Sequence, residues 1–97
     1  MIVSFGDRAT EDVYHNRSTH RLRQFPPKLV RLAWIKLDTL DSATAMLDLR
    51  SPPGNRLEAL RGDLVGFHSI RVNQQCRLIF RWERNNAYAV RLLDYHR

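Results

Sequence analysis

The order of the predicted elements indicates an α+β fold, in which an antiparallel sheet carries two or three helices on one face. Two observations predict this class. Between residues 64 and 95, three segments alternate apolar and polar residues and are separated by short polar turns, as strands joined by hairpins are. Residues 28–47 instead repeat apolar residues at a spacing of three and four, which is typical of a helix that covers a flat apolar surface. With 97 residues, the chain is expected to form one domain, residues 1–97, with a single modest core.

The first part of the chain is predicted to contribute one strand and the helices. Residues 1–5 are rich in β-branched and aromatic residues and predict a short first strand. A short helix is expected from about Asp7 to Tyr14, followed by a polar, basic loop. Pro26 and Pro27 then open a longer helix, because proline is tolerated in a first helical turn.

The longer helix is expected to bury one stripe and to be followed by a second, short helix. The predicted stripe consists of Val30, Ala33, Trp34, Leu37, Leu40 and Thr44. Asp41 or Ser42 is the candidate N-cap of the short helix. That helix would end at residue 46 or 47 and complete an αα-hairpin. Residues 51–55 contain two prolines and a glycine and mark the connection to the sheet.

The second half of the chain is predicted to form three strands whose side chains alternate between two faces. Residues 73–74 and 84–86 are the expected hairpin turns. Side chains expected on one face of their strand are His68, Ile70 and Val72; Cys76, Leu78, Phe80 and Trp82; and Tyr88, Val90, Leu92 and Asp94. Those expected on the other face are Phe67, Ser69 and Arg71; Arg77, Ile79 and Arg81; and Ala89, Arg91, Leu93 and Tyr95.

The chain is strongly basic, and most of the excess charge lies in its second half. Sixteen Lys and Arg against ten Asp and Glu give a net charge of +6. Residues 1–48 hold seven basic and six acidic residues, whereas residues 49–97 hold nine and four. All the cations except Lys28 and Lys36 are arginine, whose planar fork suits phosphate. This composition favours a polyanion, above all nucleic acid, as partner, and the alternative is a soluble protein with a basic surface.

Several kinds of site and location are not expected from this sequence. The lone Cys76 excludes an internal disulfide and a zinc site built from cysteines, and it fits a cytoplasmic protein. The four histidines are scattered, so no metal site is expected, and no glycine-rich phosphate loop has the required spacing. The first twelve residues lack the pattern of a signal peptide, and no apolar run has the length of a membrane span.

One candidate for chemistry is a basic face of the predicted sheet. Arg77 and Arg81 lie on the same side of one strand, about 13 Å apart. Arg71 and Arg91, on neighbouring strands, join them if the register permits. Such a face holds single-stranded nucleic acid when cations follow the backbone and an aromatic ring, here Tyr95, stacks on a base. The alternative is the ordinary solvated face of a half-buried sheet.

The second candidate is the end of the last predicted strand, "LLDYHR". Here His96 stands beside Tyr95 and Asp94. Histidine gives and takes protons near neutral pH, so one interpretation is proton transfer at the strand end. The other is an idle tail, since chain ends are often poorly ordered.

Three strings, in this order and spacing, carry a resemblance to a known family: "LRSPPGNRLEALRGD", "SIRVNQQCRLIF" and the closing "DYH". Together they resemble the HigB group of bacterial toxins, within the superfamily of RelE-like and ParE-like toxins. The resemblance implies the small RelE-like toxin fold and a ribosome-dependent mRNA endonuclease of a type II toxin–antitoxin module, acting without metal or cofactor. The implied partners are the ribosome, mRNA and a HigA-like helix-turn-helix antitoxin, through which alone the toxin would reach operator DNA.

The resemblance also assigns residues. Asp94, Tyr95 and His96 match the family's terminal catalytic Asp-Tyr-His, and Arg77 matches the arginine of the family motif that reads "QCRLIF" in this sequence. Arg61 stands where some members have Lys before a Gly-Asp pair, which suggests a phosphate contact. The other arginines expected to bind RNA are Arg56, Arg71, Arg81 and Arg91.

Two departures from the family pattern bear on the mechanism. Glu58 stands where some members place a catalytic histidine, and Cys76 stands where tryptophan is common. Either Glu58 or Asp94 is therefore the candidate base that deprotonates the RNA 2′-hydroxyl. His96 would act as the acid, and Arg77 would stabilise the charge of the phosphorane.

Two rival functions remain open, because the fold alone does not fix the activity. One is ParE-like inhibition of DNA gyrase, which is not expected to need an Asp-Tyr-His end. The other is a non-catalytic protein that binds ribosomes or RNA, which the glutamate at position 58 leaves open.

Overall fold

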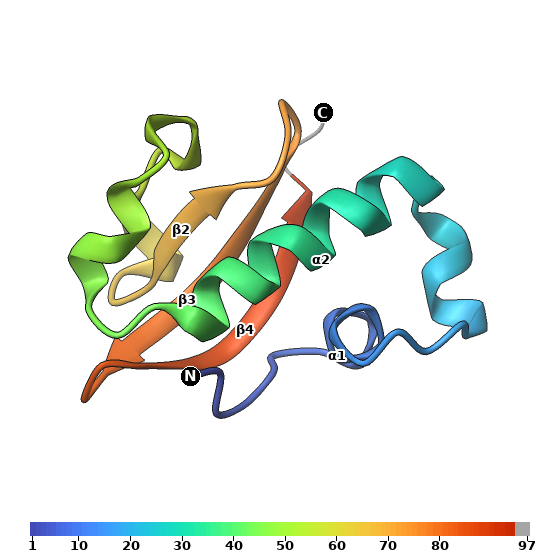
Figure 1. Ribbon diagram of the computed structural model, residues 1–97, viewed down its shortest axis with the longest axis horizontal. Helices are drawn as coiled ribbons and strands as arrows, with labels where there is room; N and C mark the ends of the chain where they lie inside the picture. Colours follow the sequence, from blue (N-terminus) through green and yellow to red (C-terminus); the bar gives the residue numbers. More distant parts are fainter. Residues whose placement is uncertain (95–97) are drawn as a thin grey trace.

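The computed structural model describes residues 1–94 and shows a four-stranded antiparallel sheet in the order β1-β2-β3-β4 (Figure 1). The strands are β1 (Glu58–Ala59), β2 (His68–Arg71), β3 (Cys76–Glu83) and β4 (Asn86–Asp94), and the α-helices are α1 (Arg8–Tyr14) and α2 (Pro27–Ser42). Short 3₁₀ helices are η1 (His20–Gln24), η2 (Met46–Arg50), η3 (Pro53–Asn55) and η4 (Gly62–Leu64). The predicted α+β class is confirmed. In the described part of the chain, no helix combines the length and hydropathy needed to cross a bilayer.

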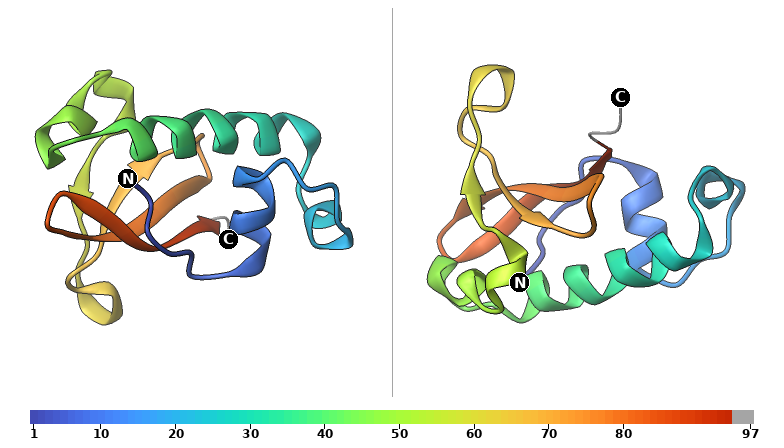
Figure 2. Two further views of the ribbon diagram at one scale, coloured as in Figure 1. Left: turned by 60° about the horizontal axis from the view of Figure 1, so that its bottom comes forward. Right: turned by 90° about the horizontal axis from the view of Figure 1, so that it is seen from above.

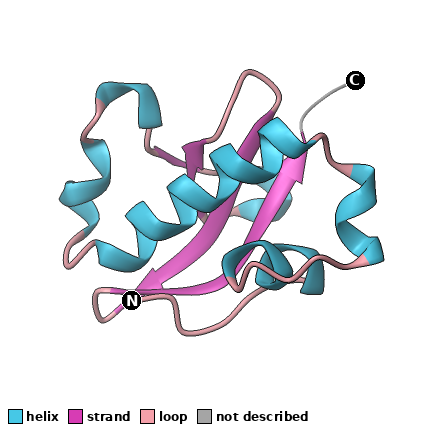
Figure 3. Ribbon diagram, turned by 45° about the vertical axis from the view of Figure 1, so that its right-hand side comes forward, coloured by secondary structure: helices cyan, strands magenta, loops and turns pink. Residues whose placement is uncertain are grey.

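Helix α2 covers one face of the sheet, and the core lies between them (Figure 3). Pro27 is its first residue, as predicted, and its buried side chains are Leu29, Ala33, Leu37 and Leu40. From the sheet, the buried residues of this core include Ile70, Leu78, Phe80, Ala87 and Val90. The prediction of a buried position is wrong for two residues of the stripe. Trp34 is 38% exposed, and Thr44 lies beyond the end of the helix and is exposed. The buried stripe passes through residues 29, 33, 37 and 40, so Trp34 lies one position outside it.

The predicted αα-hairpin after the long helix is also wrong. Helix α2 continues to Ser42, so Asp41 lies within it instead of capping a new helix. The Asp41 carboxylate instead accepts hydrogen bonds from the backbone N–H of Ile2, at 2.8 Å, and from the hydroxyl of Tyr14, at 3.0 Å. The segment that follows is the 3₁₀ helix η2, and the helix that packs against α2 is α1.

Residues 1–6 run parallel to the outer edge of β4. The predicted first strand is reduced to two isolated bridges, from Ile2 to Ala87 and from Phe5 to Val90. Gly6 ends this pairing, and a Cβ at this position would lie only 2.9 Å from the backbone oxygen of Ala89, so the close approach requires glycine. Helix α1 then covers the next part of the edge.

The start of α1 agrees with the prediction and is well capped. The Asp7 carboxylate accepts a hydrogen bond from the backbone N–H of Thr10 at 2.8 Å, as an N-cap residue does. The hydroxyl of Thr10, in turn, accepts the backbone N–H of Leu92 at 2.9 Å. This bond satisfies a strand N–H that would otherwise lie unpaired at the sheet edge.

A β-bulge in β4 changes the predicted alternation of its side chains. Ala89 has a φ of 54°, and the pairing with β3 shifts between Ile79 and Arg81. One extra residue in a strand reverses the alternation beyond it. Ala87 therefore shares the core-facing side with Val90, whereas Tyr88 pairs with Arg81, and the predicted grouping of Tyr88 with Val90 is wrong.

A buried carboxylate holds the loop between the two helices. Asp12 is 3% exposed, and it accepts hydrogen bonds from the Thr19 hydroxyl at 2.7 Å and from the Arg21 guanidinium at 2.9 Å. Arg17 lies 3.7 Å away. The hydrogen bond from Thr19 lowers the pKa of Asp12 below its ordinary value of 3.8, although burial acts in the opposite direction. The hydrogen bond and positive charge of Arg21, and the charge of Arg17, lower this pKa further.

Asp12 is expected to make the protein less stable in acid. A carboxylate with a lowered pKa in the folded state contributes stability above its unfolded pKa and loses that contribution as the pH falls through the folded pKa. We expect Asp12→Asn to lower the free energy of unfolding at pH 7, and the gap from wild type to close below about pH 4. Urea unfolding at pH 7, 5, 4 and 3 measures this, with Asp63→Asn, an exposed aspartate, as control. A gap independent of pH would contradict the expectation.

Candidate active site

The face of the sheet away from α2 gathers arginine side chains. Helix α2 and the segment around η4 lie on opposite sides of the sheet (Figure 2). On this outer face, Arg71 pairs with Arg77, Arg81 pairs with Tyr88, and Arg91 pairs with Ile79. Residues paired in register share a face, so the register brings Arg71 and Arg91 to the same side as Arg77 and Arg81.

Arg77 is the most firmly held of these arginines. Its Nε donates to Ser69 Oγ at 2.7 Å, and its Nη2 donates to the backbone carbonyl of Arg56. The same Nη2 forms an ion pair with Glu58 Oε1 at 3.0 Å. The Arg77 side chain is only 12% exposed. A guanidinium fixed from three sides presents its planar fork in one orientation.

Strand β1 brings Glu58 to this arginine. Glu58 pairs with Ser69 of β2, and Ser69 pairs with Ile79 of β3, so Glu58 extends the row of outer-face residues. The carboxylate is 59% exposed, and it is therefore accessible to a ligand as well as to Arg77. The sequence did not predict β1, because a two-residue strand leaves no alternation to detect.

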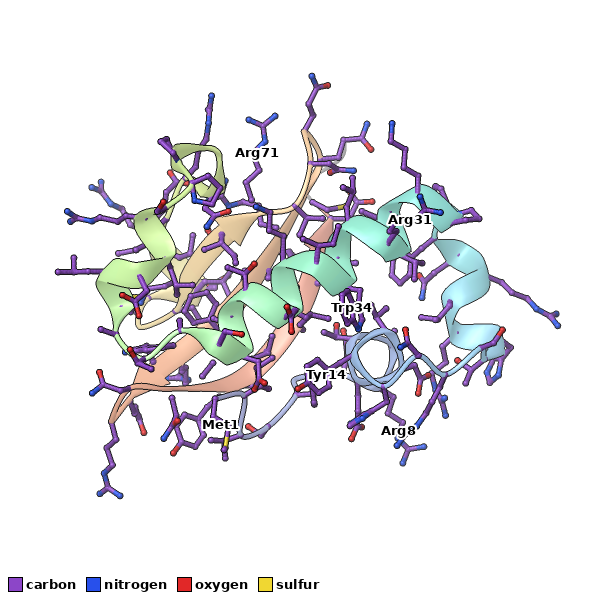
Figure 4. The ribbon with its side chains drawn as sticks, viewed as in Figure 1. Met1, Arg8, Tyr14, Arg31, Trp34 and Arg71 are labelled. Carbon is purple, nitrogen blue, oxygen red and sulfur yellow. The ribbon has the colours of Figure 1, made fainter. Side chains whose placement is uncertain are left out.

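A polar pocket of about 280 Å³ opens beside Arg77. Its lining consists of Arg56, Arg71, Asn73, Gln74 and Arg77. Arg71 donates from Nε to the carbonyl of Asn73 at 3.1 Å, and Figure 4 shows its side chain extending outward beside the β2–β3 turn. Arg71 and Arg77 stand directly opposite each other, an arrangement in which like charges repel. Three guanidinium groups around one small pocket therefore suit an anion such as a phosphate.

The other predicted RNA-binding arginines do not line this pocket. The guanidinium of Arg81 lies over the ring of Phe67, 4.6 Å from its centroid, and so holds the segment after η4 against the sheet. The side chain of Arg91 extends beside Gly6. Arg61 is exposed immediately before η4. These three remain candidates for contacts with RNA beyond the pocket.

The last strand carries Asp94 on the other side of the sheet from Arg77. Asp94 pairs with Cys76, which is buried on the core-facing side, whereas Arg77 pairs with Leu93. Burial raises the pKa of the Cys76 thiol, and the charge of Asp94 adds to this. The structure thus brings Glu58, and not Asp94, into contact with Arg77. The predicted catalytic residues Tyr95 and His96 lie outside the described residues.

The sequence predicted no role at the site for two buried polar residues, Ser69, which accepts a hydrogen bond from Arg77, and Asn55, which precedes Arg56. Ser69 was predicted only as one member of an outer face, and Asn55 only as part of a proline-rich connection. Both are fully buried polar residues. The local sequence gives little signal for either role: Ser69 lies between His68 and Ile70, and Asn55 directly precedes the "RLEAL" string. Within residues 1–94, no three His, Cys, Asp or Glu side chains gather as a metal site requires.

Comparison with known proteins decides the family. The sequence profile described as the RelE-like toxin of type II toxin–antitoxin system HigB matches residues 3–96. The chain belongs to the HigB-like toxins. This HigB-like toxin is 48% identical over 82 residues to Toxin HigB-1 of Vibrio cholerae, a match that spans 84% of each chain. It is 40% identical over 74 residues to an uncharacterised protein of Haemophilus influenzae, spanning 76% of this chain and 71% of the relative.

Solved structures support the fold of this HigB-like toxin. A chain of the YoeB–YefM complex from Staphylococcus aureus superimposes with a TM-score of 0.60 and 21% sequence identity. The superposition covers 100% of this chain and 99% of the other. At this identity the likeness establishes the fold, which is the RelE-like toxin fold expected from the sequence.

Proposed function

We propose that this HigB-like toxin cleaves mRNA on the ribosome and that its own side chains, without a metal ion, supply the chemistry. The observation that carries the proposal is the Arg77 guanidinium, held beside the Glu58 carboxylate at an arginine-lined pocket. Cleavage of RNA through its 2′-hydroxyl requires a base, an acid and fixed positive charge for the phosphorane. Arg77 and Glu58 would supply two of these three.

In the proposed reaction, Glu58 accepts the proton of the 2′-hydroxyl as the 2′-oxygen attacks phosphorus. Arg77 holds the phosphorane, whose extra negative charge its fork neutralises. The bond from phosphorus to the 5′-oxygen then breaks, and His96 gives its proton to that oxygen. A 2′,3′-cyclic phosphate and a 5′-hydroxyl result. Tyr95 would stack on a flanking base. Asp94 is the alternative base, and the family resemblance places it with Tyr95 and His96 in the catalytic end of the chain.

The proposed substrate and partners follow from the shape of the site and from the relatives. A pocket of about 280 Å³ offers few contacts to base edges, so the ribosome would orient the mRNA and supply the entropic advantage of positioning. Free mRNA should be a poor substrate. A HigA-like helix-turn-helix antitoxin would neutralise the toxin in the cytoplasm and carry it to operator DNA. The YoeB–YefM toxin–antitoxin complex from Staphylococcus aureus, which contains a chain of this fold, supports an antitoxin as partner.

Primer extension on mRNA tests the proposal. We expect the purified toxin to produce discrete breaks in mRNA on translating ribosomes and few breaks in the same mRNA without ribosomes. A parallel supercoiling assay with DNA gyrase tests the ParE-like alternative. Loss of supercoiling with intact mRNA would overturn the proposal in favour of gyrase inhibition. Inhibited translation with intact mRNA would overturn it in favour of a non-catalytic binder.

A further inference from the structure

The carbonyl that accepts a hydrogen bond from Arg77 comes from a residue in an unfavourable backbone conformation. Arg56 has φ 45° and ψ 57°, in the left-handed region that residues other than glycine seldom adopt. This conformation follows directly after η3, and the Arg56 carbonyl accepts the bond from Arg77 Nη2. Such a conformation persists only where neighbouring contacts enforce it. The preceding residue, Asn55, provides those contacts.

Asn55 is fully buried, and both the nitrogen and the oxygen of its side-chain amide form hydrogen bonds. Its Nδ2 donates to the backbone carbonyls of Leu49 and Ser51, both at 3.2 Å. Its Oδ1 accepts from Nζ of Lys36, which extends from α2. The amide therefore ties together the end of η2, the following loop and the long helix. A buried amide satisfied at both ends fixes the chain in one position, because breaking any of these bonds leaves a buried polar group unpaired.

We propose that Asn55 is a positioning residue for Arg77. It acts through the backbone of the next residue: Lys36 and the carbonyls of Leu49 and Ser51 hold Asn55, and Asn55 in turn holds the Arg56 carbonyl against the guanidinium. The catalytic consequence rests on the proposed function, in which Arg77 stabilises the phosphorane. The contact of Arg77 with Glu58 must loosen when Glu58 takes a proton, whereas a backbone carbonyl does not titrate. The Arg56 carbonyl therefore keeps the Arg77 guanidinium oriented toward the phosphate throughout the proposed reaction.

The proposal predicts the effect of Asn55→Asp, a replacement of nearly equal size. The carboxylate has no hydrogen to donate, so its oxygens repel the carbonyls of Leu49 and Ser51 and the loop shifts. We expect kcat for cleavage on ribosomes to fall about 10²-fold, since small misplacements of a catalytic group have effects of this size. KM should change less than kcat, because Arg71, which lines the pocket from β2, does not depend on the shifted loop. Lys36→Met, which removes the donor to Asn55, should lower kcat by a smaller factor and serves if Asn55→Asp does not fold.

Nuclear magnetic resonance of Arg77 gives a second readout, independent of cleavage. The Nε–H of Arg77 donates to Ser69 Oγ and should exchange slowly with water in the wild type. In Asn55→Asp we expect this exchange to quicken about tenfold, as loss of roughly one hydrogen bond would cause. Arg56→Gly should keep the slow exchange, because glycine adopts the left-handed conformation freely and retains the carbonyl. Loss of the slow exchange in Arg56→Gly would overturn the role of the carbonyl.

The control is Tyr14→Phe, which deletes a hydrogen bond to Asp41 between the two helices, far from the site (Figure 4). It should lower stability and leave kcat and the Arg77 exchange as in wild type. The proposal is overturned if Asn55→Asp and Lys36→Met keep the wild-type exchange rate, or if their loss of kcat equals the unfolded fraction. If the wild-type protein does not cleave mRNA, the proposed function fails, while faster exchange in Asn55→Asp still supports the positioning of Arg77.

Discussion

Replacing Arg77 with alanine is expected to lower mRNA cleavage on ribosomes by about 10²–10⁴-fold. The guanidinium of Arg77 is held by three partners: the Ser69 hydroxyl, the Arg56 carbonyl and the Glu58 carboxylate. In the proposed reaction it meets the charge that develops on the phosphorane, so its loss acts on the transition state. Primer extension in single-turnover conditions, with toxin in excess over ribosome-bound mRNA, measures the chemical step directly.

A second replacement separates charge from geometry. Arg77→Lys keeps the positive charge but cannot reach Ser69 and the Arg56 carbonyl with one planar fork, so we expect it to remain at least tenfold slower than wild type. Arg8→Gln is the matched control, since Arg8 is an exposed arginine of α1 on the far side of the molecule from Arg71 (Figure 4). Urea unfolding of each variant checks that it is folded. Wild-type cleavage by a folded Arg77→Ala protein would rule out the role proposed for this residue.

The second large effect is expected for Glu58→Gln. Glutamine keeps an oxygen that accepts the hydrogen bond from Arg77, so the site geometry is preserved, but it cannot take a proton from the 2′-hydroxyl. We expect the single-turnover rate to fall about 10²–10⁴-fold and the limb of the pH–rate profile that reports the base to disappear. The measurement is the rate of mRNA cleavage on ribosomes across a range of pH values.

Asp94→Asn provides the comparison that decides which carboxylate is the base. Asp94 faces the side of Cys76, and Glu58 contacts Arg77, so the larger loss should follow the change at Glu58. A lost activity in Asp94→Asn together with a retained activity in Glu58→Gln would show that the Glu58–Arg77 ion pair is structural and that Asp94 is the base. Equal losses would indicate that both carboxylates take part in proton transfer.

The parts of the fold that the sequence predicted are those with strong local patterns. Residues 76–82 alternate so regularly that strand β3 and its two faces follow directly, and the proline pair marks the start of α2. The bulge at Ala89 has no such signal, because alanine is not a residue that favours positive φ. The exposure of Trp34 was also not predictable, because a large aromatic residue beside the buried stripe of a helix can lie in the core or at the surface.

The candidate site was predictable to a similar extent. The shared face of Arg71 and Arg77 follows from alternation, and the hairpin turn between them sets the register. The contact between Glu58 and Arg77 was not predictable from local pattern, because it depends on the pairing of β1, a strand of two residues, with β2. The hydrogen bonds from Arg77 to Ser69 and to the Arg56 carbonyl likewise depend on tertiary packing, which residue propensities do not predict.

The parallel pairing of residues 1–6 with β4 has a consequence for how the protein is made. Ser4 and Ala89, which share a hydrogen bond, are 85 residues apart in sequence, so residues 1–6 meet their partner strand only after the residues between them have been translated. Contacts between such distant segments close large loops and form late in folding. A growing chain that still lacks β4 therefore has neither a finished core nor a partner for residues 1–6, and it cannot complete its fold before that strand has been made.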